Sequence, residues 1–256
     1  MIKADYSEIA SYYDKGRTLT EKNLMMWLDL VAKFSRASAG AKVLDLGCGT
    51  GRFSLPMAAR LGFDMTGVDS SAEMLVKAME KDSNFNVRWI LGDAQALAFP
   101  AGSFEIAFMS HLLHHCNHPP MVLKECYRVL VPSGIILIRY GTMDQIRNDA
   151  EHTFFPEAVE IDQQRIFSRE RLEKWLLDAG FVDISSQEIM QQTYKTGAAH
   201  LDAARAKSTS VLSMISEESF QAGLRRLEDH VAGNPNDKWL LCDRMTLTLG
   251  RKSKFA

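Results

Sequence analysis

The stretch that decides the fold is Lys42-Val43-Leu44-Asp45-Leu46-Gly47-Cys48-Gly49-Thr50-Gly51-Arg52-Phe53. Its apolar first half predicts a buried parallel strand, and the glycines at alternate positions predict a tight turn that a ligand can approach closely. A helix is expected to begin near Arg52. Open α/β sheets bind ligands at the carboxyl ends of their strands, where the N–H groups of such a turn face the site. The stretch therefore predicts a binding site for a small charged or polar molecule.

The spacing of the glycines distinguishes two kinds of ligand. Gly47, Gly49 and Gly51 form Gly-x-Gly-x-Gly, whereas a dinucleotide-binding turn has Gly-x-Gly-x-x-Gly. Arg52 stands where the third dinucleotide glycine would fall. With Asp45 two residues ahead of the first glycine, the run resembles the first motif of class I S-adenosylmethionine-dependent methyltransferases. The resemblance implies S-adenosyl-L-methionine as cofactor and S-adenosyl-L-homocysteine as product.

Composition and charge bear on the class of protein. The chain has 256 residues, of which 46% are hydrophobic and 24% charged, enough to bury a large core in one soluble globular domain. The net charge of −2 gives no bulk electrostatic reason to expect nucleic acid. We find neither a signal peptide nor an apolar run long enough for membrane insertion, so a cytoplasmic location is expected. The four cysteines form no C-x-x-C pair and are expected to be reduced thiols.

A carboxylate follows the second predicted strand. That strand spans residues 63–68 and ends at Asp69, roughly 20 residues beyond the glycines. At this distance a βαβ unit brings a carboxylate to a ribose, where its two oxygens can accept hydrogen bonds from both hydroxyls. The alternative is a helix N-cap, but Ser70 and Ser71 also precede the next helix and serve that purpose. We therefore expect Asp69 to bind the ribose.

The third predicted strand, residues 87–91, leads into Gly92-Asp93-Ala94. This tripeptide and the apolar, proline-ended loop after it resemble the Gly-Asp-Ala motif of the same methyltransferases. The resemblance implies that Asp93 accepts a hydrogen bond from the adenine amino group and that the backbone of Ala94 meets the ring. Asp93 supplies the acceptor that a dry pocket needs, although Asp is also a favoured residue of plain surface turns.

Four histidines follow the fourth predicted strand, residues 102–110, which is expected beside the first. The run His111 to Pro119 is similar to the Leu-His-His-x-x-Asp-Pro run of methyltransferases that act on quinone precursors, carrier-bound acids and other small molecules. His111 and His114 are the candidates for a catalytic base, and the two later histidines suit a structural role. No carboxylate or second sulfur stands at a partner spacing, so no metal site is expected.

Residues 125–134, Glu-Cys-Tyr-Arg-Val-Leu-Val-Pro-Ser-Gly, resemble the family's Glu-x-x-Arg-Val-Leu-Lys-Pro-Gly-Gly. Val131 and Ser133 depart from that pattern in a turn expected to be remote from the cofactor. The resemblance implies an architectural role, in which the motif ends a helix and begins the fifth strand, residues 135–140.

Residues 1–38 are expected to form a helical cap ahead of the first core strand. They contain Tyr12-Tyr13-Asp14-x-x-Arg17, similar to the Tyr-Asp-x-x-Arg element that precedes the core in many small-molecule methyltransferases. The resemblance implies that Tyr13 and Arg17 close over the methionine end of the cofactor. An aromatic face suits a sulfonium, and a guanidinium suits a carboxylate. The alternative is that these helices only cover a sheet edge.

Two segments lie outside the expected core. Residues 141–167 follow the fifth strand as a long loop on the ligand side of the sheet, and residues 196–233 insert two helical segments before a last strand at 239–249. We expect both segments to wall the acceptor pocket, with Phe154 and Phe155 lining or capping it. The alternatives are that these aromatics fasten the insertion to the sheet edge and that the insertion is a lid or a homodimer surface.

The resemblance implies a doubly wound, Rossmann-like α/β fold: a seven-stranded, mostly parallel sheet with an antiparallel last strand and helices on both faces. The expected divisions are the cap 1–38, the cofactor core 39–140, the loop 141–167 and the remaining strands 168–256. The residues expected to bind the cofactor are Tyr13, Arg17, Asp45, Gly47, Cys48, Gly49, Gly51, Asp69, Ser70, Met74, Asp93, Ala94 and Ser110.

The implied reaction is in-line attack of an oxygen, nitrogen, sulfur or carbon of a small-molecule acceptor on the sulfonium methyl group. Because a sulfonium is already activated, the protein has mainly to align the reacting atoms, and a base is needed only where the acceptor must lose a proton. Two alternatives from other classes stay open: a non-catalytic cofactor-binding or regulatory protein, and an NAD-dependent or nucleotide-dependent Rossmann enzyme. The acceptor is not evident from the sequence.

Overall fold

The computed structural model describes residues 19–83, 87–147, 149–234 and 237–255. Tyr13 and Arg17, predicted to lie over the cofactor, fall outside this part of the chain. The composition predicts one domain, and the contacts of the described residues fall into two compact units. The core unit comprises residues 24–140, 169–187 and 246–255; the additional unit comprises residues 19–23, 141–168 and 188–245.

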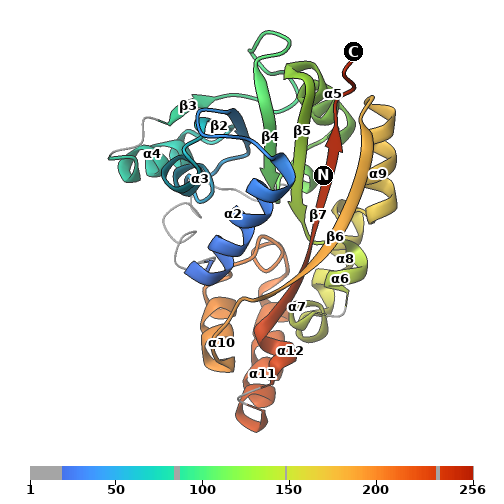
Figure 1. Cartoon of the computed structure of the whole chain (residues 1–256). Helices are drawn as coiled ribbons and strands as arrows, with labels where there is room; N and C mark the ends of the chain where they lie inside the picture. The colour runs from blue at the N-terminus through green and yellow to red at the C-terminus, as the bar shows by residue number, and fades with distance from the viewer. Residues whose placement is uncertain (1–18, 84–86, 148, 235–236, 256) are drawn as a thin grey trace. The chain divides into compact units, whose positions relative to one another are not determined.

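A seven-stranded sheet runs in the order β3-β2-β1-β4-β5-β7-β6 (Figure 1). Strands β1 to β5 pair in parallel, and β7 lies antiparallel to β5. The predicted sheet, mostly parallel with an antiparallel last strand, is confirmed. The strands are β1 (Lys42–Leu46), β2 (Asp64–Asp69), β3 (Arg88–Leu91), β4 (Phe104–Ser110), β5 (Leu130–Tyr140), β6 (Val182–Gln192) and β7 (Cys242–Arg251).

The central strands are apolar on both faces. In β1 every residue after Lys42 is buried, and the second halves of β4 and β5 are buried almost throughout. Strands of this kind need helices on both sides of the sheet, as in parallel α/β folds. The strand order reverses direction between β1 and β4, so the carboxyl ends of these two strands flank the crevice where open α/β sheets bind ligands.

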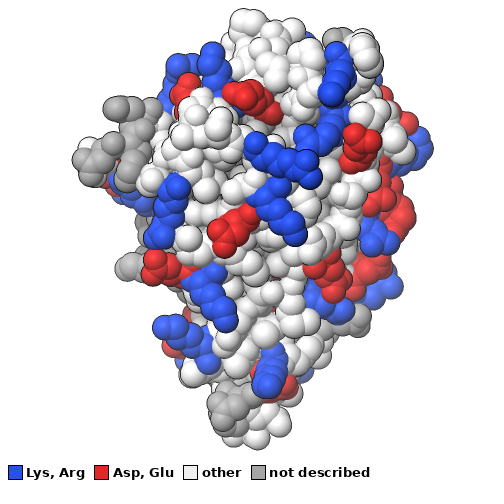
Figure 2. Space-filling model, viewed as in Figure 1, with Lys and Arg blue, Asp and Glu red and all other residues white. Residues whose placement is uncertain are grey.

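Helices of the core unit accompany the strands. Figure 1 shows α3 and α4 beside β2 and β3, and α5 with α9 beyond β5. Within the described segments, no helix combines the length and the hydropathy that crossing a membrane requires. Charged side chains of both signs are interspersed on the face drawn in Figure 2, in keeping with the net charge of −2. The helices are α2 (Glu21–Ser35), α3 (Ser54–Leu61), α4 (Ala72–Lys81), η1 (Leu113–His115), α5 (Pro119–Val129) and α9 (Arg169–Asp178).

The segment 141–167 is not the long loop that the sequence predicts. It forms α6 (Met143–Ile146), α7 (Ala150–Phe154) and α8 (Pro156–Arg165). A capping box joins Thr142 and Gln145 at the start of α6. Asp149 caps α7, and Pro156 opens α8. These helices are too short, and α8 is too polar, to leave the apolar stripe from which helices are predicted.

The rest of the additional unit follows the prediction more closely. The insertion 196–233 contains two helices, α10 (Gly197–Arg205) and α11 (Glu217–Gly233). The predicted last strand, 239–249, begins too early, because its first residues form the short helix α12 (Lys238–Leu241). Asp237 caps that helix by accepting a hydrogen bond from the backbone of Trp239.

The additional unit has a hydrophobic core of its own. Phe155 is 1% exposed, and its ring stacks on Phe220 of α11 with centroids 6.0 Å apart. A Cβ on Gly223 would lie 2.1 Å from the Phe155 ring, so the glycine lets the ring rest against the backbone of α11. Phe154 is also buried and contacts the ring of Trp239 at 5.9 Å. The segment 141–167 and the insertion are therefore packed together.

Candidate functional site

The glycine turn lies at the carboxyl end of β1. Gly49 has φ +54°, in the left-handed region that side chains disfavour, and a Cβ built there meets no described atom within 4 Å. The space in front of Gly49 is therefore open to a ligand. A Cβ built on Gly51 would instead lie 2.7 Å from the ring of Trp89, so this part of the turn packs against β3.

Asp69 joins the turn to the end of β2. Its Oδ2 accepts a hydrogen bond from Gly49 N–H at 2.8 Å, and its Oδ1 accepts one from Ser71 N–H at 3.0 Å. Burial raises the pKa of the carboxyl, and these backbone donors oppose the shift. Each oxygen retains a further lone pair for a ligand hydroxyl. The cap of α4 is Ser71, whose Oγ accepts from Met74 N–H at 3.2 Å, as the sequence predicts, and Ser70 is exposed.

Asp45 is a second carboxyl beside the turn, and its side chain is buried. Ser54 Oγ donates a hydrogen bond to its Oδ2 at 2.5 Å. Burial raises the pKa of Asp45 to about 7, the Ser54 bond opposes this, and the charge of Asp69 adds to it. Two carboxyls that both resist ionisation favour a positively charged ligand nearby.

Cys48 lies inside the turn as a packing residue. It is buried, and a Cβ on Gly67 of β2 would lie 3.0 Å from its Sγ. Burial raises the pKa of the Cys48 thiol, and the charge of Asp45 raises it further. The thiol therefore stays protonated and is not a nucleophile.

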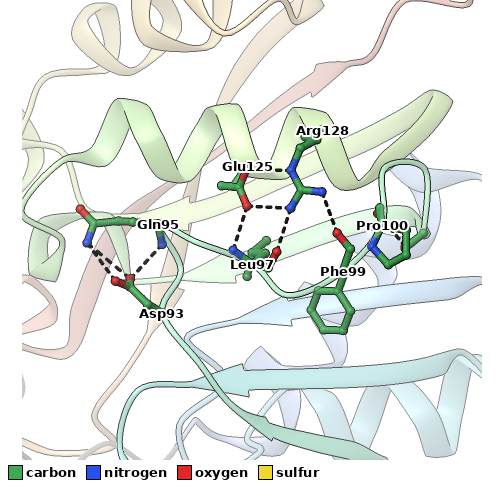
Figure 3. Close-up of polar contacts among 8 residues, drawn as sticks. Asp93, Gln95, Leu97, Phe99, Pro100, Glu125 and Arg128 are labelled. Atoms are coloured by element: carbon green, nitrogen blue, oxygen red, sulfur yellow. Dashed lines mark hydrogen bonds and ion pairs between the residues drawn. The ribbon is translucent and has the colours of Figure 1, made fainter.

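Asp93 stands in the exposed turn after β3 (Figure 3). Its Oδ1 accepts hydrogen bonds from the backbone N–H of Gln95 at 2.9 Å and from the Gln95 side chain at 3.4 Å. Gln95 Oε1 in turn accepts from His118 N–H at 3.0 Å. This local pattern agrees with the surface-turn alternative, and the adenine contact of Asp93 and Ala94 stays a prediction.

The loop after Asp93 is held by Glu125 and Arg128 of α5 (Figure 3). Glu125 accepts from the backbone N–H of Leu97 at 2.8 Å, and Arg128 donates to the carbonyls of Leu97 at 2.8 Å and Phe99 at 2.6 Å. The Arg128 hydrogen bond lowers the pKa of Glu125. The role of the 125–134 motif is thus wider than the prediction, because its Glu-x-x-Arg pair positions the candidate adenine loop. The i,i+3 spacing of Glu125 and Arg128 on a predicted helix is the sequence feature that could have indicated this pair.

The histidine run begins at the end of β4. His111 has φ +55°, an uncommon conformation for a residue with a side chain, and its N–H donates to the carbonyl of Arg139 at 2.9 Å. The rings of His111 and His114 meet edge to face with their centroids 6.2 Å apart, and the ring centroids of His114 and His115 are 4.0 Å apart. Among the described residues, no three His, Cys, Asp or Glu side chains gather as metal ligands.

Arg139 is a site residue that the sequence reading missed. It is 3% exposed at the end of β5, and its Nη1 donates to Ser110 Oγ at 3.0 Å. Its guanidinium lies over the rings of Trp27, at 4.7 Å, and Phe53, at 5.7 Å. The sequence feature that could have indicated Arg139 is a positively charged residue in an otherwise apolar strand. Ser110 is therefore held at the strand end by a buried, fixed guanidinium.

The core unit thus brings together most of the predicted cofactor residues. Gly49 bonds directly to Asp69, whose charge acts on Asp45, and Ser110 ends the neighbouring strand β4. Met74 is buried in the first turn of α4. Phe154 and Phe155 belong to the core of the additional unit, which agrees with the fastening alternative, and their contact with a substrate stays a prediction.

Part of the chain is similar to known methyltransferase sequences. Residues 43–134 match the family model described as a methyltransferase domain. The ubiquinone/menaquinone biosynthesis C-methyltransferase UbiE of Bdellovibrio bacteriovorus is 27% identical over 164 residues, 62% of this chain and 70% of that protein. The demethylmenaquinone methyltransferase of Listeria monocytogenes is 34% identical over 135 residues, 50% of this chain and 57% of that protein. The match thus spans little more than half of the Listeria relative.

Solved structures share the fold. Phosphoethanolamine N-methyltransferase 2 of Haemonchus contortus, in complex with S-adenosyl-L-methionine, superimposes with a TM-score of 0.66 at 21% identity, over 95% of this chain and 56% of that one. The [4+2]-cyclase SpnF superimposes with a TM-score of 0.64 at 21% identity, over 93% and 85% of the two chains.

The sheet order, the glycine turn and the match of residues 43–134 to the methyltransferase-domain model are those of class I S-adenosylmethionine-dependent methyltransferases. Over the matched residues its sequence is similar to the UbiE-type and demethylmenaquinone methyltransferases named above. The cofactor of this class is S-adenosylmethionine, and the residues at the turn suit it because they combine an open backbone with two carboxyls, the buried Asp45 and the half-buried Asp69.

Proposed function

We propose that this chain transfers the methyl group of S-adenosylmethionine to a small-molecule acceptor. The observation that carries the proposal is the 2.8 Å hydrogen bond from Gly49 N–H to Asp69 Oδ2. It fixes a carboxylate beside an open glycine turn, at the edge of the sheet where α/β folds bind nucleotides. A ribose with two hydroxyl donors suits that carboxylate.

The remaining cofactor contacts follow from charge and position. S-adenosylmethionine, when bound, supplies an activated methyl group on a sulfonium. Asp45 and Asp69 favour that cation, because burial raises the pKa of both carboxyls and a nearby positive charge opposes that shift. We assign the adenine to the loop of Asp93, which Glu125 and Arg128 hold in place.

The acceptor side of the proposal rests on the ends of β4 and β5. Because the donor is already activated, alignment of the reacting atoms supplies most of the acceleration. We assign to His111 or His114 the removal of a proton from acceptors that carry one. Arg139 positions Ser110 through the 3.0 Å hydrogen bond between them.

A labelled-methyl assay tests this function. The protein is incubated with methyl-labelled S-adenosylmethionine and a panel that includes demethylmenaquinone and phosphoethanolamine, the chemistries named in the relatives. Transfer of label to a small molecule, abolished by Gly49→Val, supports the proposal. Tight cofactor binding without label transfer across this panel and a metabolite extract opposes it.

The alternative of a cofactor-binding protein without methyl transfer has one observation in its favour. The [4+2]-cyclase SpnF has the same fold and is named for a different reaction. Fold alone therefore does not establish turnover, and the labelled-methyl assay separates the two functions. A cytoplasmic location and a homodimer stay predictions.

A further inference from the structure

A buried polar network joins α7, α8 and the segment before α11 within the additional unit. Nε2 of His152 donates to Oδ2 of Asp162 at 2.9 Å, and Nε of Arg165 donates to Oδ1 of the same carboxyl at 2.7 Å. Arg165 Nη2 also donates to Ser210 Oγ at 2.8 Å. His152 and Asp162 are only 5% and 4% exposed. Three segments of the unit therefore meet in one buried network.

One ring atom of this network lacks a hydrogen-bond partner among the described residues. Nδ1 of His152 is buried and unpartnered. Because a carboxylate only accepts, Nε2 carries a proton, and in the neutral ring Nδ1 offers a lone pair. Arg165 forms an ion pair with the same Asp162 carboxyl, with Nε 2.7 Å from Oδ1. Leaving such a buried atom unpaired is unfavourable, and a ligand that donates a hydrogen bond to Nδ1 relieves it.

The surroundings favour a donor that carries positive charge. Asp149 Oδ1 accepts a hydrogen bond from the backbone N–H of His152 at 2.9 Å. Burial raises the pKa of Asp149, and the charges of Glu151, Asp243 and the network's own carboxyl raise it further. Carboxyls that disfavour one another's ionisation are stabilised by a nearby cation. An ammonium ion provides both the charge and the N–H donor.

We propose that this network binds a small primary or secondary amine, held as an ammonium ion that donates a hydrogen bond to Nδ1 of His152. The proposal rests on side chains of the additional unit and is independent of methyl transfer. An alcohol donates as well but leaves the repulsion among the carboxyls in place. A metal ion fits less well, because the described residues contain no group of three metal-ligating side chains.

Two probes of equal charge test the proposal. Ethylamine is an ammonium ion at neutral pH and carries N–H donors, whereas tetramethylammonium carries the same charge and none. The ¹⁵N resonance of His152 Nδ1 is followed during titration of the full chain. We expect a saturable shift with ethylamine and none with tetramethylammonium. An unmoved resonance with ethylamine, as a bound water alone would give, or equal shifts with both probes, contradicts the proposal.

A pair of variants localises the binding. His152→Gln retains an N–H donor toward Asp162 and removes the acceptor at Nδ1, so ethylamine affinity measured by calorimetry should fall about tenfold or more. His230→Gln is the matched control, because His230 also pairs with an aspartate, Asp237, at 3.0 Å in the same unit but is partly exposed. It should bind ethylamine normally. Equal affinity in His152→Gln and the parent would overturn the assignment.

A second variant covers the case in which His152→Gln fails to fold. His152→Asn places an amide near the Nδ1 position and lets its oxygen accept the same hydrogen bond. We expect it to retain part of the ethylamine affinity, and complete loss in a folded His152→Asn protein would argue against a role for that acceptor. Methylation of the bound amine in the labelled-methyl assay identifies it as acceptor, and binding without methylation identifies a non-reacting ligand.

Discussion

The core unit and the additional unit position their key side chains in different ways. In the core unit, Asp45 and Asp69 stand at or near strand ends and bond to Ser54 and Gly49, close by in the same βαβ unit. In the additional unit, the ring of Phe155 packs against α11, far along the chain. Strand ends and glycine turns place groups by local rules, whereas short capped helices are placed by distant packing partners. Substitutions should therefore affect cofactor binding in the core unit and stability in the additional unit.

Gly49→Val should have the largest effect on binding. A β-branched side chain opposes the left-handed backbone, at about 1–2 kcal/mol, and enters the open space in front of the turn. We expect S-adenosylhomocysteine affinity to fall by more than about 100-fold in calorimetry. Gly102→Val is the matched control, since Gly102 has φ +68° and equally open space in the turn before β4. Normal binding by Gly49→Val would mean that the turn is not the site.

Phe155→Ala should have the largest effect on stability. Removing this fully buried ring leaves a cavity in the core of the additional unit, which costs about 3–5 kcal/mol. Urea unfolding should show that loss, while cofactor affinity per folded molecule stays unchanged. Phe255→Ala, at a ring that is 97% exposed, is the control and should change neither property. Full stability with lost turnover would contradict the structural role and support the prediction that Phe155 lines the acceptor pocket.

These contrasts explain how much could be predicted from the sequence. The strand β1, the turn and Asp69 follow from an apolar run, glycine spacing and chain distance. The helices of 141–167 escaped prediction because caps such as Thr142, rather than an apolar stripe, start them. The packing of Phe155 on Gly223 depends on a contact between distant segments that no local pattern encodes. Arg139 was missed for a similar reason, because its aromatic partners come from other elements.

Asp69→Ala should weaken binding by a smaller amount. It removes the acceptor for Gly49 N–H and the assigned acceptor for the ribose, so we expect a loss of about 1–3 kcal/mol in cofactor affinity. Asp69→Asn keeps one acceptor oxygen, so its cofactor affinity should lie between those of the parent protein and Asp69→Ala. Calorimetry with S-adenosylhomocysteine measures all three proteins. Unchanged affinity in Asp69→Ala would remove the ribose assignment.

The pH dependence of stability should report Asp45. Burial raises its pKa from the ordinary 3.8 to about 7, so between these values the folded protein holds a proton that the unfolded chain releases. The stabilisation that the protonated Asp45 gives the folded protein is fully present below pH 3.8 and is lost as the pH rises toward 7. The slope is at most about 1.4 kcal/mol per pH unit. Urea unfolding of the parent and of Asp45→Asn should differ in that slope, and identical pH profiles would contradict the assignment.

The central claim is that the turn after β1 and Asp69 form a site for S-adenosylmethionine rather than for a dinucleotide. Calorimetric titration of the parent protein with S-adenosylhomocysteine and, separately, with NAD tests it most directly. We expect saturable binding of S-adenosylhomocysteine at one site per chain and no measurable heat of binding with NAD. Saturable binding of NAD with no response to S-adenosylhomocysteine would contradict it.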